Sequence, residues 1–209
     1  MELTFYDYWR SSAAYRVRIA LNIKGVDFRA VEIDLTSGEH QGEAYLAVNP
    51  QGLVPALAVD GRVISQSLAI IDWLDSRFPE PRLIPADPLD RAQAMAQALV
   101  IATDIHPINN LRVQKYLRNE LGADKAAVEA WIHHWIGSGF AALEALAPEE
   151  GLLGGEQPGV ADIFLVPQVY NARRFGMALD AFPQVVRIDA ALRQIDAFAQ
   201  AAPEAVKPT

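Results

Sequence analysis

Two serines stand at the start of a predicted helix, directly after a predicted strand. Ser11 and Ser12 open the segment SSAAYRVRIALNIKG, which ends at Gly25 as helices often do. The N-terminus of a helix presents unpaired N–H groups and about half a positive charge, so anions bind there. A serine hydroxyl at this place can also donate to a thiolate, which lowers the pKa of the thiol and keeps it nucleophilic. The alternative is that both serines only cap the helix.

A thiol for such chemistry has to come from a ligand, because the chain contains no cysteine. The same absence excludes a disulfide framework, a cysteine-ligated zinc site and a cysteine nucleophile. His133 and His134 are neighbours in a predicted helix, so their side chains point about 100° apart, and no third ligand accompanies them. We therefore assign no metal.

A second helix start and one strand edge add further binding groups. Gln66 and Ser67 precede the predicted helix SLAIIDWLDSRF and form a second candidate anion site, although a plain cap is the alternative. The Val54-Pro55 bond leads into a predicted strand. If this bond is cis, the N–H and C=O of Val54 face outward and can pair with a peptide. The alternative is a trans proline at a strand start, which is the commoner case. Together these features suit a short peptide that carries a thiol and a carboxylate, and glutathione fits that description.

The elements that hold these residues mix short strands with helices. LTFYDY and FRAVEIDL are predicted strands on either side of the first helix, and VPALAV and RVI form a hairpin around Asp60-Gly61. The second helix follows, so the order is β-α-β and then β-β-α. The polar stretch from Thr36 to Glu43 is expected to be a loop.

A proline-rich stretch separates this region from a helical one. The segment PEPRLIPADP holds four prolines in ten residues, which predicts a linker. After it, periodicity predicts helices over residues 89–119, 124–146, 160–172 and 184–199, with Pro107 and Pro167 bending a helix or marking its first turn. The fold class is therefore α/β plus all-α: an α/β domain over 1–80, a linker over 81–88 and an all-helical domain over 89–209.

Composition and charge limit the kinds of molecule that the chain is expected to bind. The chain has 209 residues, 51% of them hydrophobic, which is enough for a core in one large domain or two small ones. Its formal net charge is −8, and no basic run is longer than Arg173-Arg174, so nucleic acid binding is disfavoured. Glu2 and Asp7 interrupt what would be the apolar core of a signal peptide, and no 18 apolar residues run together. We expect a cytoplasmic protein with no membrane partner.

Several motifs in order carry a resemblance to a known family. The segments RSSAAYRVRIALNIKGV, NPQGLVPAL, ISQSLAIIDWLD, HPINNLRV and ADIFLVPQVYNARRF resemble the zeta class of glutathione transferases, nearly from end to end. Within that class the sequence is most similar to maleylacetoacetate and maleylpyruvate isomerases. The resemblance implies an N-terminal thioredoxin-like domain, a helical C-terminal domain, and glutathione as a cofactor that isomerisation does not consume. It also implies a homodimer, for which apolar surface on the first helix of the C-terminal domain could supply the contact.

The resemblance assigns residues to a glutathione site. Ser11 is implied to bind the glutathione thiolate, helped by Ser12 and by the backbone around Ala13. Val54, before a cis Pro55, is implied to pair with the cysteinyl backbone. The remaining residues of this implied site are Gln66 and Ser67 at the γ-glutamyl end, His40 or Gln41 at the glycyl end, and Arg16, His106, Asn110, Leu111 and Arg112.

For the substrate, the resemblance points to arginine. Arg174 matches the position that holds a substrate carboxylate, and a guanidinium supplies both charge and orientation there. Arg10 and Arg173 are further candidates beside it, and the alternative for the Arg173-Arg174 pair is an exposed helix end that stabilises the macrodipole. We expect Ser11, Ser12 and Arg174 to be the catalytic residues.

Three positions depart from the family pattern. Ala13 replaces a cysteine that many members carry, so glutathione must supply the only sulfur that reacts. Gly159 stands where a serine or threonine usually precedes the capping aspartate, here Asp162, so that the capping box is half missing. The loop from Thr36 to Glu43 is shorter than in some relatives, which leaves the choice between His40 and Gln41 open.

The expected reaction is the cis–trans isomerisation of maleylacetoacetate or maleylpyruvate, which are products of aromatic ring cleavage. The thiolate of glutathione adds to the cis double bond, the resulting single bond rotates, and elimination leaves the trans isomer. Arginines and helix dipoles stabilise the developing oxyanion. One alternative is a transferase that consumes glutathione on α-haloacids, and another is a non-catalytic interaction module of the same fold.

Overall fold

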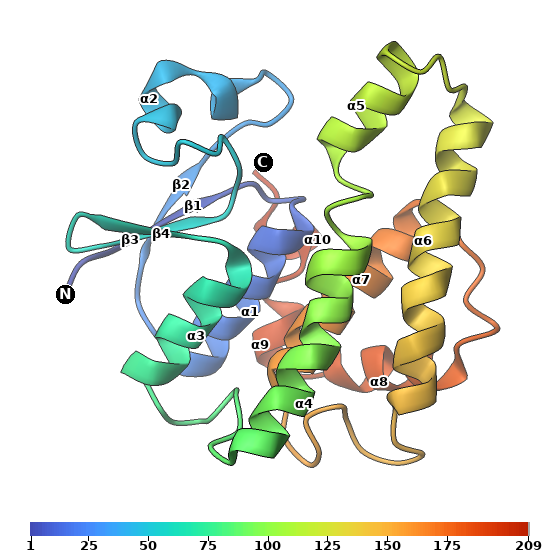
Figure 1. Cartoon of the computed structure of the whole chain (residues 1–209). Coiled ribbons are helices and arrows are strands. Elements are labelled where there is room, and N and C mark those ends of the chain that lie inside the picture. The colour runs from blue at the N-terminus through green and yellow to red at the C-terminus, as the bar shows by residue number, and fades with distance from the viewer. Residues whose placement is uncertain (209) are drawn as a thin grey trace. The chain divides into compact units, whose positions relative to one another are not determined.

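The computed structural model describes residues 1–208, and the chain divides into two compact units (Figure 1). The first unit combines Met1–Leu83 with the C-terminal segment that begins at Gln194, and the second unit is Ile84–Arg193. The sequence prediction extended the helical domain to residue 209, so the structure differs from it from Gln194 onward. The physical reason is that this segment buries Phe198 and Ala201 within the first unit.

The first unit contains one four-stranded sheet in the order β2-β1-β3-β4. Strand β1 (Leu3–Asp7) runs parallel to β2 (Arg29–Glu32) and antiparallel to β3 (Ala56–Val59), which pairs with β4 (Arg62–Ser65) as a hairpin. The predicted order of β-α-β followed by β-β-α is confirmed, and the sheet is thioredoxin-like. Asp60 and Gly61, both with positive φ, form the hairpin turn as their residue types predict.

Two helices, α1 (Ser12–Lys24) and α3 (Ser67–Arg77), pack side by side against the sheet (Figure 1). Gly25 ends α1 in the left-handed conformation, with φ 59°. Lys24, in the last turn of α1, is buried and donates to the carboxylate of Asp75 at 2.7 Å and to two carbonyl oxygens at 2.6 Å. A buried ammonium has to be compensated in this way, so the contact locks the ends of the two helices together.

The stretch from Thr36 to Glu43 is more ordered than predicted. It contains a 3-10 helix, η1 (Glu39–Gln41), and leads directly into the short helix α2 (Glu43–Leu46). Tyr45 of α2 is buried and its hydroxyl donates to the carbonyl oxygen of Leu53 at 2.7 Å. A single tertiary anchor thus stabilises a helix too short to show any sequence periodicity.

The second unit is helical. It contains α4 (Pro88–Leu99), a π-helix η2 (Val100–Ile105), α5 (Leu111–Asn119), α6 (Lys125–Leu146), α7 (Val160–Arg174) and α8 (Pro183–Leu192). No helix among the described residues is long and apolar enough to cross a membrane.

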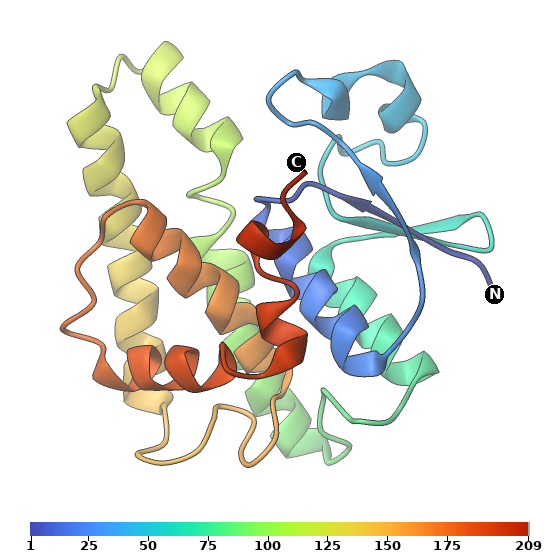
Figure 2. The same ribbon diagram turned by 180° about the vertical axis from the view of Figure 1, so that it is seen from behind.

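Two predicted helices prove to be interrupted. The prediction of one helix over 89–119 is wrong, because the chain leaves helical conformation after η2 and Asn110 caps a new helix beyond Pro107. The predicted helix over 184–199 divides into α8 in the second unit and α9 (Asp196–Ala199) in the first. Pro167, by contrast, lies inside α7. Seen from behind, α9 and α10 (Pro203–Val206) lie beside α1 (Figure 2).

The N-terminus of α7 shows how the half-missing capping box is replaced. Gly159 has no side chain to contribute, and the carboxylate of Asp162 alone accepts the N–H of Gly159 at 2.9 Å. The same carboxylate accepts the N–H groups of Leu153 and Gly154 at 3.0 and 2.8 Å. Asp162 therefore binds the preceding loop as well as the helix start.

Candidate active site

The N-terminus of α1 combines a serine hydroxyl with unused backbone donors. Ser11 is half-buried at the N-cap position, and its Oγ accepts the N–H of Ala14 at 3.2 Å. Within residues 1–208, no hydrogen bond uses the N–H groups of Ser12 and Ala13. A hydroxyl accepts and donates at once, so the cap leaves the Ser11 O–H able to donate to an anion. Capping and anion binding are therefore compatible here.

The strand edge before β3 offers a peptide group. The Val54–Pro55 bond is cis, as expected, and Pro55 is buried while Val54 is half-buried. In the described part of the chain nothing hydrogen-bonds the N–H or C=O of Val54. The preceding carbonyl of Leu53 is fixed by Tyr45 and Asn49, each at 2.7 Å. The edge is thus held in place while its own donor and acceptor remain available for a bound peptide.

The N-terminus of α3 carries a strained residue. Gln66 has φ 73°, an unusual conformation for a residue other than glycine, and such strain concentrates at ligand sites. Its amide donates to the side chain of Gln51 at 3.0 Å. Ser67 begins the helix and is nearly buried, and its Oγ accepts from the guanidinium of Arg16 at 3.3 Å.

Arg16 contributes to the candidate site from the interior of the first unit. Its side chain is 2% exposed, and burial lowers the pKa of the guanidinium to about 9. Because Arg16 belongs to α1 and donates to the first residue of α3, it joins the two helix N-termini and places a positive charge behind them. An anionic ligand at either N-terminus gains from that charge.

His40 and Gln41 lie in η1 and face the turn that leads to Val54. The side-chain amide of Gln41 donates to the carbonyl of Gly52 at 3.1 Å. A Cβ added to Gly52 would lie 2.5 Å from that amide nitrogen and 2.9 Å from the His40 carbonyl oxygen, so the two segments are in close contact. The choice between His40 and Gln41 as ligand to the glycyl carboxylate stays open.

The predicted residues of the second unit fall in two places. His106, half-buried, lies after η2, and the side chain of Asn110 caps α5 by accepting the N–H of Arg112 at 3.1 Å. Leu111 and Arg112 are exposed. Two bonds to carbonyls hold the connecting segment, from Trp131 to Ile108 at 3.0 Å and from Gln114 to Asn109 at 2.8 Å.

The two arginines that end α7 differ in their surroundings. Arg173 donates to the buried carboxylate of Asp189 at 2.6 Å and so has a structural role. Arg174 is exposed, contacts Asn171 at 2.7 Å, and lies over the Phe175 ring at 4.5 Å from its centroid. Arg174 therefore remains the better candidate to bind a substrate carboxylate. In the first unit, Arg10 is exposed and stacks on Trp9.

Gln51 is a candidate that the sequence interpretation missed. It accepts a hydrogen bond from the Gln66 amide at the N-terminus of α3 and lies in the segment NPQGLVPAL, in which the sequence predicts a role only for Val54 and Pro55. A signal was present, since an amide directly before the glycine of a tight turn lies close to the strand edge that the turn serves.

Taken together, fold and site define a protein with a thioredoxin-like unit, two helix N-termini suited to anions and a free peptide edge, followed by a helical unit. Residues 10–77 match the family model for the glutathione S-transferase N-terminal domain. The maleylacetoacetate isomerase of Pseudomonas aeruginosa is 47% identical over 204 residues, which cover 96% of both chains.

Solved structures agree with these matches. A holo structure of maleyl pyruvate isomerase, described as a bacterial glutathione S-transferase of the zeta class, has 46% identity and a TM-score of 0.95, with 99% of both chains covered. A maleylacetoacetate isomerase from Anaeromyxobacter dehalogenans, with glutathione bound in its active site, has 37% identity and a TM-score of 0.88, with 99% and 97% covered. The chain therefore belongs to the glutathione transferase family, in its zeta class of maleylacetoacetate and maleylpyruvate isomerases.

Proposed function

We propose that this protein is a glutathione-dependent isomerase that converts maleylacetoacetate or maleylpyruvate, products of aromatic ring cleavage, to the fumaryl isomer. One observation supports it above all: the N-terminus of α1 offers the Ser11 hydroxyl and two unused N–H groups to a thiolate in a protein without cysteine. The open peptide group of Val54 and the N-terminus of α3 fit the rest of a glutathione molecule.

Different residues of the first unit bind different parts of glutathione. Ser11 donates its O–H to the sulfur and, with the N–H groups of Ser12 and Ala13, favours the anionic form of the thiol. Val54 pairs with the cysteinyl backbone, Gln66 and Ser67 hold the γ-glutamyl end, and His40 or Gln41 binds the glycyl carboxylate. When bound, glutathione supplies the thiolate that adds reversibly to the cis double bond and is released unchanged.

The substrate carries two carboxylates and two keto groups, one of them conjugated to the cis double bond, and these call for fixed positive charge. Arg174 binds a carboxylate and Arg10 assists it, while His106, Asn110, Leu111 and Arg112 complete the list of proposed ligand contacts. Arginine is preferred to lysine because its fork orients the substrate and its charge is permanent. The same charge stabilises the negative charge that develops on the keto oxygen.

The decisive assay follows substrate, trans product and free thiol together. Purified protein is mixed with maleylpyruvate or maleylacetoacetate, with and without glutathione. The proposal requires product only when glutathione is present and no loss of thiol. Ser11→Ala should lose most of the rate, whereas Ser76→Ala, an exposed serine near the end of α3, should retain it. Thiol loss with an α-haloacid and no isomerisation would instead indicate a transferase, and no retention on immobilised glutathione would indicate an interaction module.

The role of Arg174 has its own test. Arg174→Gln should raise KM for the keto acid by about tenfold or more and leave binding of glutathione unchanged, because the lost interaction is with the substrate carboxylate. Arg82→Gln, a change at an exposed arginine of the linker, is the control and should alter neither constant. Equal KM values in Arg174→Gln and the native protein would contradict the assignment.

The proposal includes a homodimer. Helix α4 exposes Leu89, at 66%, and Leu99, at 37%, and a second copy of the chain packed on this helix would cover them. Light scattering should give twice the mass of one chain, and Leu89→Glu should shift the protein toward a monomer. A native monomer at micromolar concentration would contradict this part of the proposal.

The proposal also places the reaction in the cytoplasm. The cytoplasm keeps glutathione reduced, and this chemistry needs the reduced thiol. Cell fractionation with the native chain tests this location, and recovery outside the cytoplasmic fraction would overturn it.

A further inference from the structure

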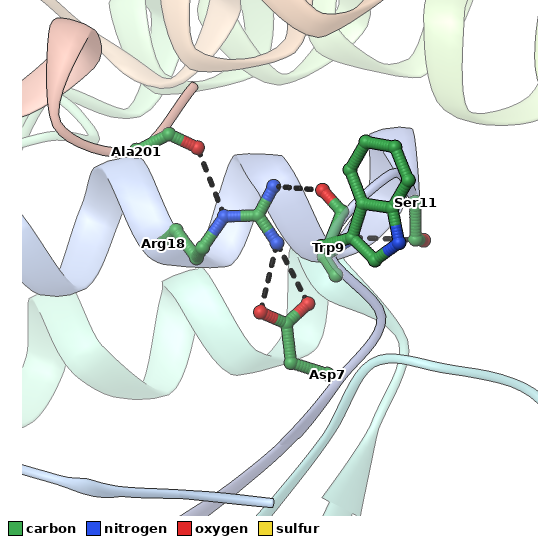
Figure 3. Close-up of polar contacts among 6 residues, drawn as sticks. Asp7, Trp9, Ser11, Arg18 and Ala201 are labelled. Carbon is green, nitrogen blue, oxygen red and sulfur yellow. Dashed lines mark hydrogen bonds and ion pairs between the residues drawn. The ribbon is translucent and has the colours of Figure 1, made fainter. Parts of the chain in front are cut away.

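The guanidinium of Arg18 lies at the centre of a buried network in the first unit. Its side chain is 5% exposed and makes four hydrogen bonds (Figure 3). Two bonds go from Nη1 to the carboxylate oxygens of Asp7, at 2.7 and 2.8 Å. Nη2 donates to the carbonyl of Trp9 at 2.9 Å, and Nε donates to the carbonyl of Ala201 at 2.9 Å. One side chain thus connects the end of β1, the turn before α1 and the C-terminal segment.

The turn that Arg18 holds is the one that presents Ser11. Asp7 is the last residue of β1 and Ser11 is the N-cap of α1, so only three residues lie between them. The Ser11 N–H donates to the carbonyl of Tyr8 at 2.8 Å, and the next carbonyl, that of Trp9, is the one that Arg18 binds. Two of the three backbone carbonyls between Asp7 and Ser11 are therefore fixed, and Figure 3 shows the Trp9 carbonyl between Arg18 and Ser11.

The C-terminal segment completes this network from the far end of the chain. Besides Ala201, its carbonyls at Phe198 and Ala197 accept bonds from Tyr15 and Asn22 of α1, at 3.3 and 3.0 Å. Phe198 and Ala201 are buried, so these bonds lie in a region that excludes water. Bonds from a charged guanidinium are stronger in such surroundings than in water.

Resting on the function proposed above, we propose that Arg18 is a positioning residue for Ser11. By binding the Asp7 carboxylate and the carbonyls of Trp9 and Ala201 together, Arg18 fixes the turn between β1 and α1, so that the Ser11 hydroxyl meets the glutathione sulfur. The C-terminal segment is part of this support through the carbonyl of Ala201. Arg18 touches neither thiol nor keto acid in this role; it acts through Ser11.

Lysine at position 18 separates charge from geometry. Arg18→Lys keeps the positive charge opposite Asp7 but lacks the planar fork that reaches all three acceptors. A small displacement of a catalytic group costs rate steeply, so we expect kcat to fall by about tenfold or more. The pKa of the bound glutathione thiol, read from thiolate absorbance during a pH titration, should rise by about one unit, while KM for the keto acid stays nearly constant.

Two companion variants distinguish positioning from mere stability. Ile71→Val removes one methyl group from a fully buried side chain of α3 that has no part in the hydrogen bonds of Arg18, so it should lower the free energy of unfolding and leave those bonds in place. It should leave the thiol pKa unchanged. In Ser11→Ala, adding Arg18→Lys should produce little further rise of the thiol pKa, because the group through which Arg18 acts is already gone.

The outcomes separate this proposal from the function on which it rests. If the native protein fails to bind glutathione or to lower its thiol pKa, both are overturned. If the native protein lowers the thiol pKa and Arg18→Lys lowers it by the same amount, only the positioning role is overturned. The same conclusion follows if Ile71→Val raises the thiol pKa as much as Arg18→Lys does.

Amide hydrogen exchange tests the role of the C-terminal segment. Arg18→Lys should increase exchange both around residues 198–202 and around the start of α1. Unchanged exchange around residues 198–202 would show that this segment does not support Ser11.

Discussion

Ser11 caps α1 and, in the proposed function, binds a thiolate, and one substitution separates these two tasks. Aspartate is as good an N-cap as serine, so Ser11→Asp should keep the stability that Ser11→Ala loses, about 1 kcal/mol. A carboxylate beside the sulfur repels the thiolate, so the thiol pKa should rise further in Ser11→Asp than in Ser11→Ala. Chemical denaturation and thiolate absorbance measure the two effects. An active Ser11→Asp enzyme would show that the hydroxyl is not the thiolate donor.

Asp162 gives a pH dependence whose sign follows from its surroundings. Burial raises the pKa of Asp162 to about 6, although the N–H groups of Gly159, Gly154 and Leu153 oppose the rise. The unfolded chain releases this proton near pH 4, so between about pH 4 and 6 only the folded state retains it. The contribution of Asp162 to the free energy of unfolding must therefore fall as pH rises through this window, by on the order of 3 kcal/mol at about 1.4 kcal/mol per pH unit.

The matched variant for this effect is Asp162→Asn, which cannot titrate. The difference in unfolding free energy, native minus variant, should decrease from pH 4 to 6 and stay constant above. Urea denaturation at several pH values measures it. A difference that increases over the same window would mean that the three N–H donors outweigh burial.

Among elements, the ends of α1 and α3 are joined by a buried ion pair, Lys24 with Asp75. Lys24→Met removes the ammonium that binds the buried carboxylate of Asp75 at 2.7 Å. Breaking such a pair costs about 3–5 kcal/mol, so Lys24→Met should lower the urea midpoint strongly. The double variant Lys24→Met, Asp75→Asn should recover part of the loss, because the uncompensated charge is gone. Lys125→Met, in the exposed pair with Glu129, is the control and should change little.

The elements that sequence could predict are those with a local signal. The strands of the sheet, α1 with its serine cap and glycine end, and α6 after Asp124 all follow from periodicity and capping residues. The π-helix η2 carries no such signal, although Pro107 and the cap residue Asn110 mark the break after it, and the bond from Trp131 to Ile108 holds the segment between them. Likewise, α2 depends on the single anchor of Tyr45. Interactions that join distant segments decide these elements, and a single sequence does not display them.

The residues of the candidate site also differ in whether a local sequence signal could predict them. Ser11, Val54 and Ser67 could be found from sequence because each stands at an element boundary, where backbone groups lack partners. Arg18 could not, because nothing local distinguishes it from Arg16 in the run YRVRIAL; one reaches Asp7, Trp9 and Ala201, and the other reaches Ser67. Which arginine supports which helix N-terminus is a property of the folded unit.

For the molecule as a whole, the C-terminal segment makes the first unit discontinuous in sequence. The chain must complete its last helices before Ala201 can accept from Arg18, so the support of Ser11 forms only when both ends of the chain are in place. A ligand that binds at Ser11 favours the conformation in which this network is intact. Ligand binding and global stability are therefore linked in this protein.

This linkage predicts how glutathione changes thermal stability. At a concentration one hundred times its Kd, glutathione should add about 2.7 kcal/mol to the free energy of unfolding and raise Tm by several degrees. The matched ligand is γ-glutamyl-alanyl-glycine, which keeps every group except the thiol and should raise Tm less at the same concentration. The difference between the two ligands measures the sulfur interaction, so it should shrink in Ser11→Ala, where the N–H groups of Ser12 and Ala13 remain, and also in Arg18→Lys. An equal Tm rise with both ligands in the native protein would show that the N-terminus of α1 does not bind the sulfur.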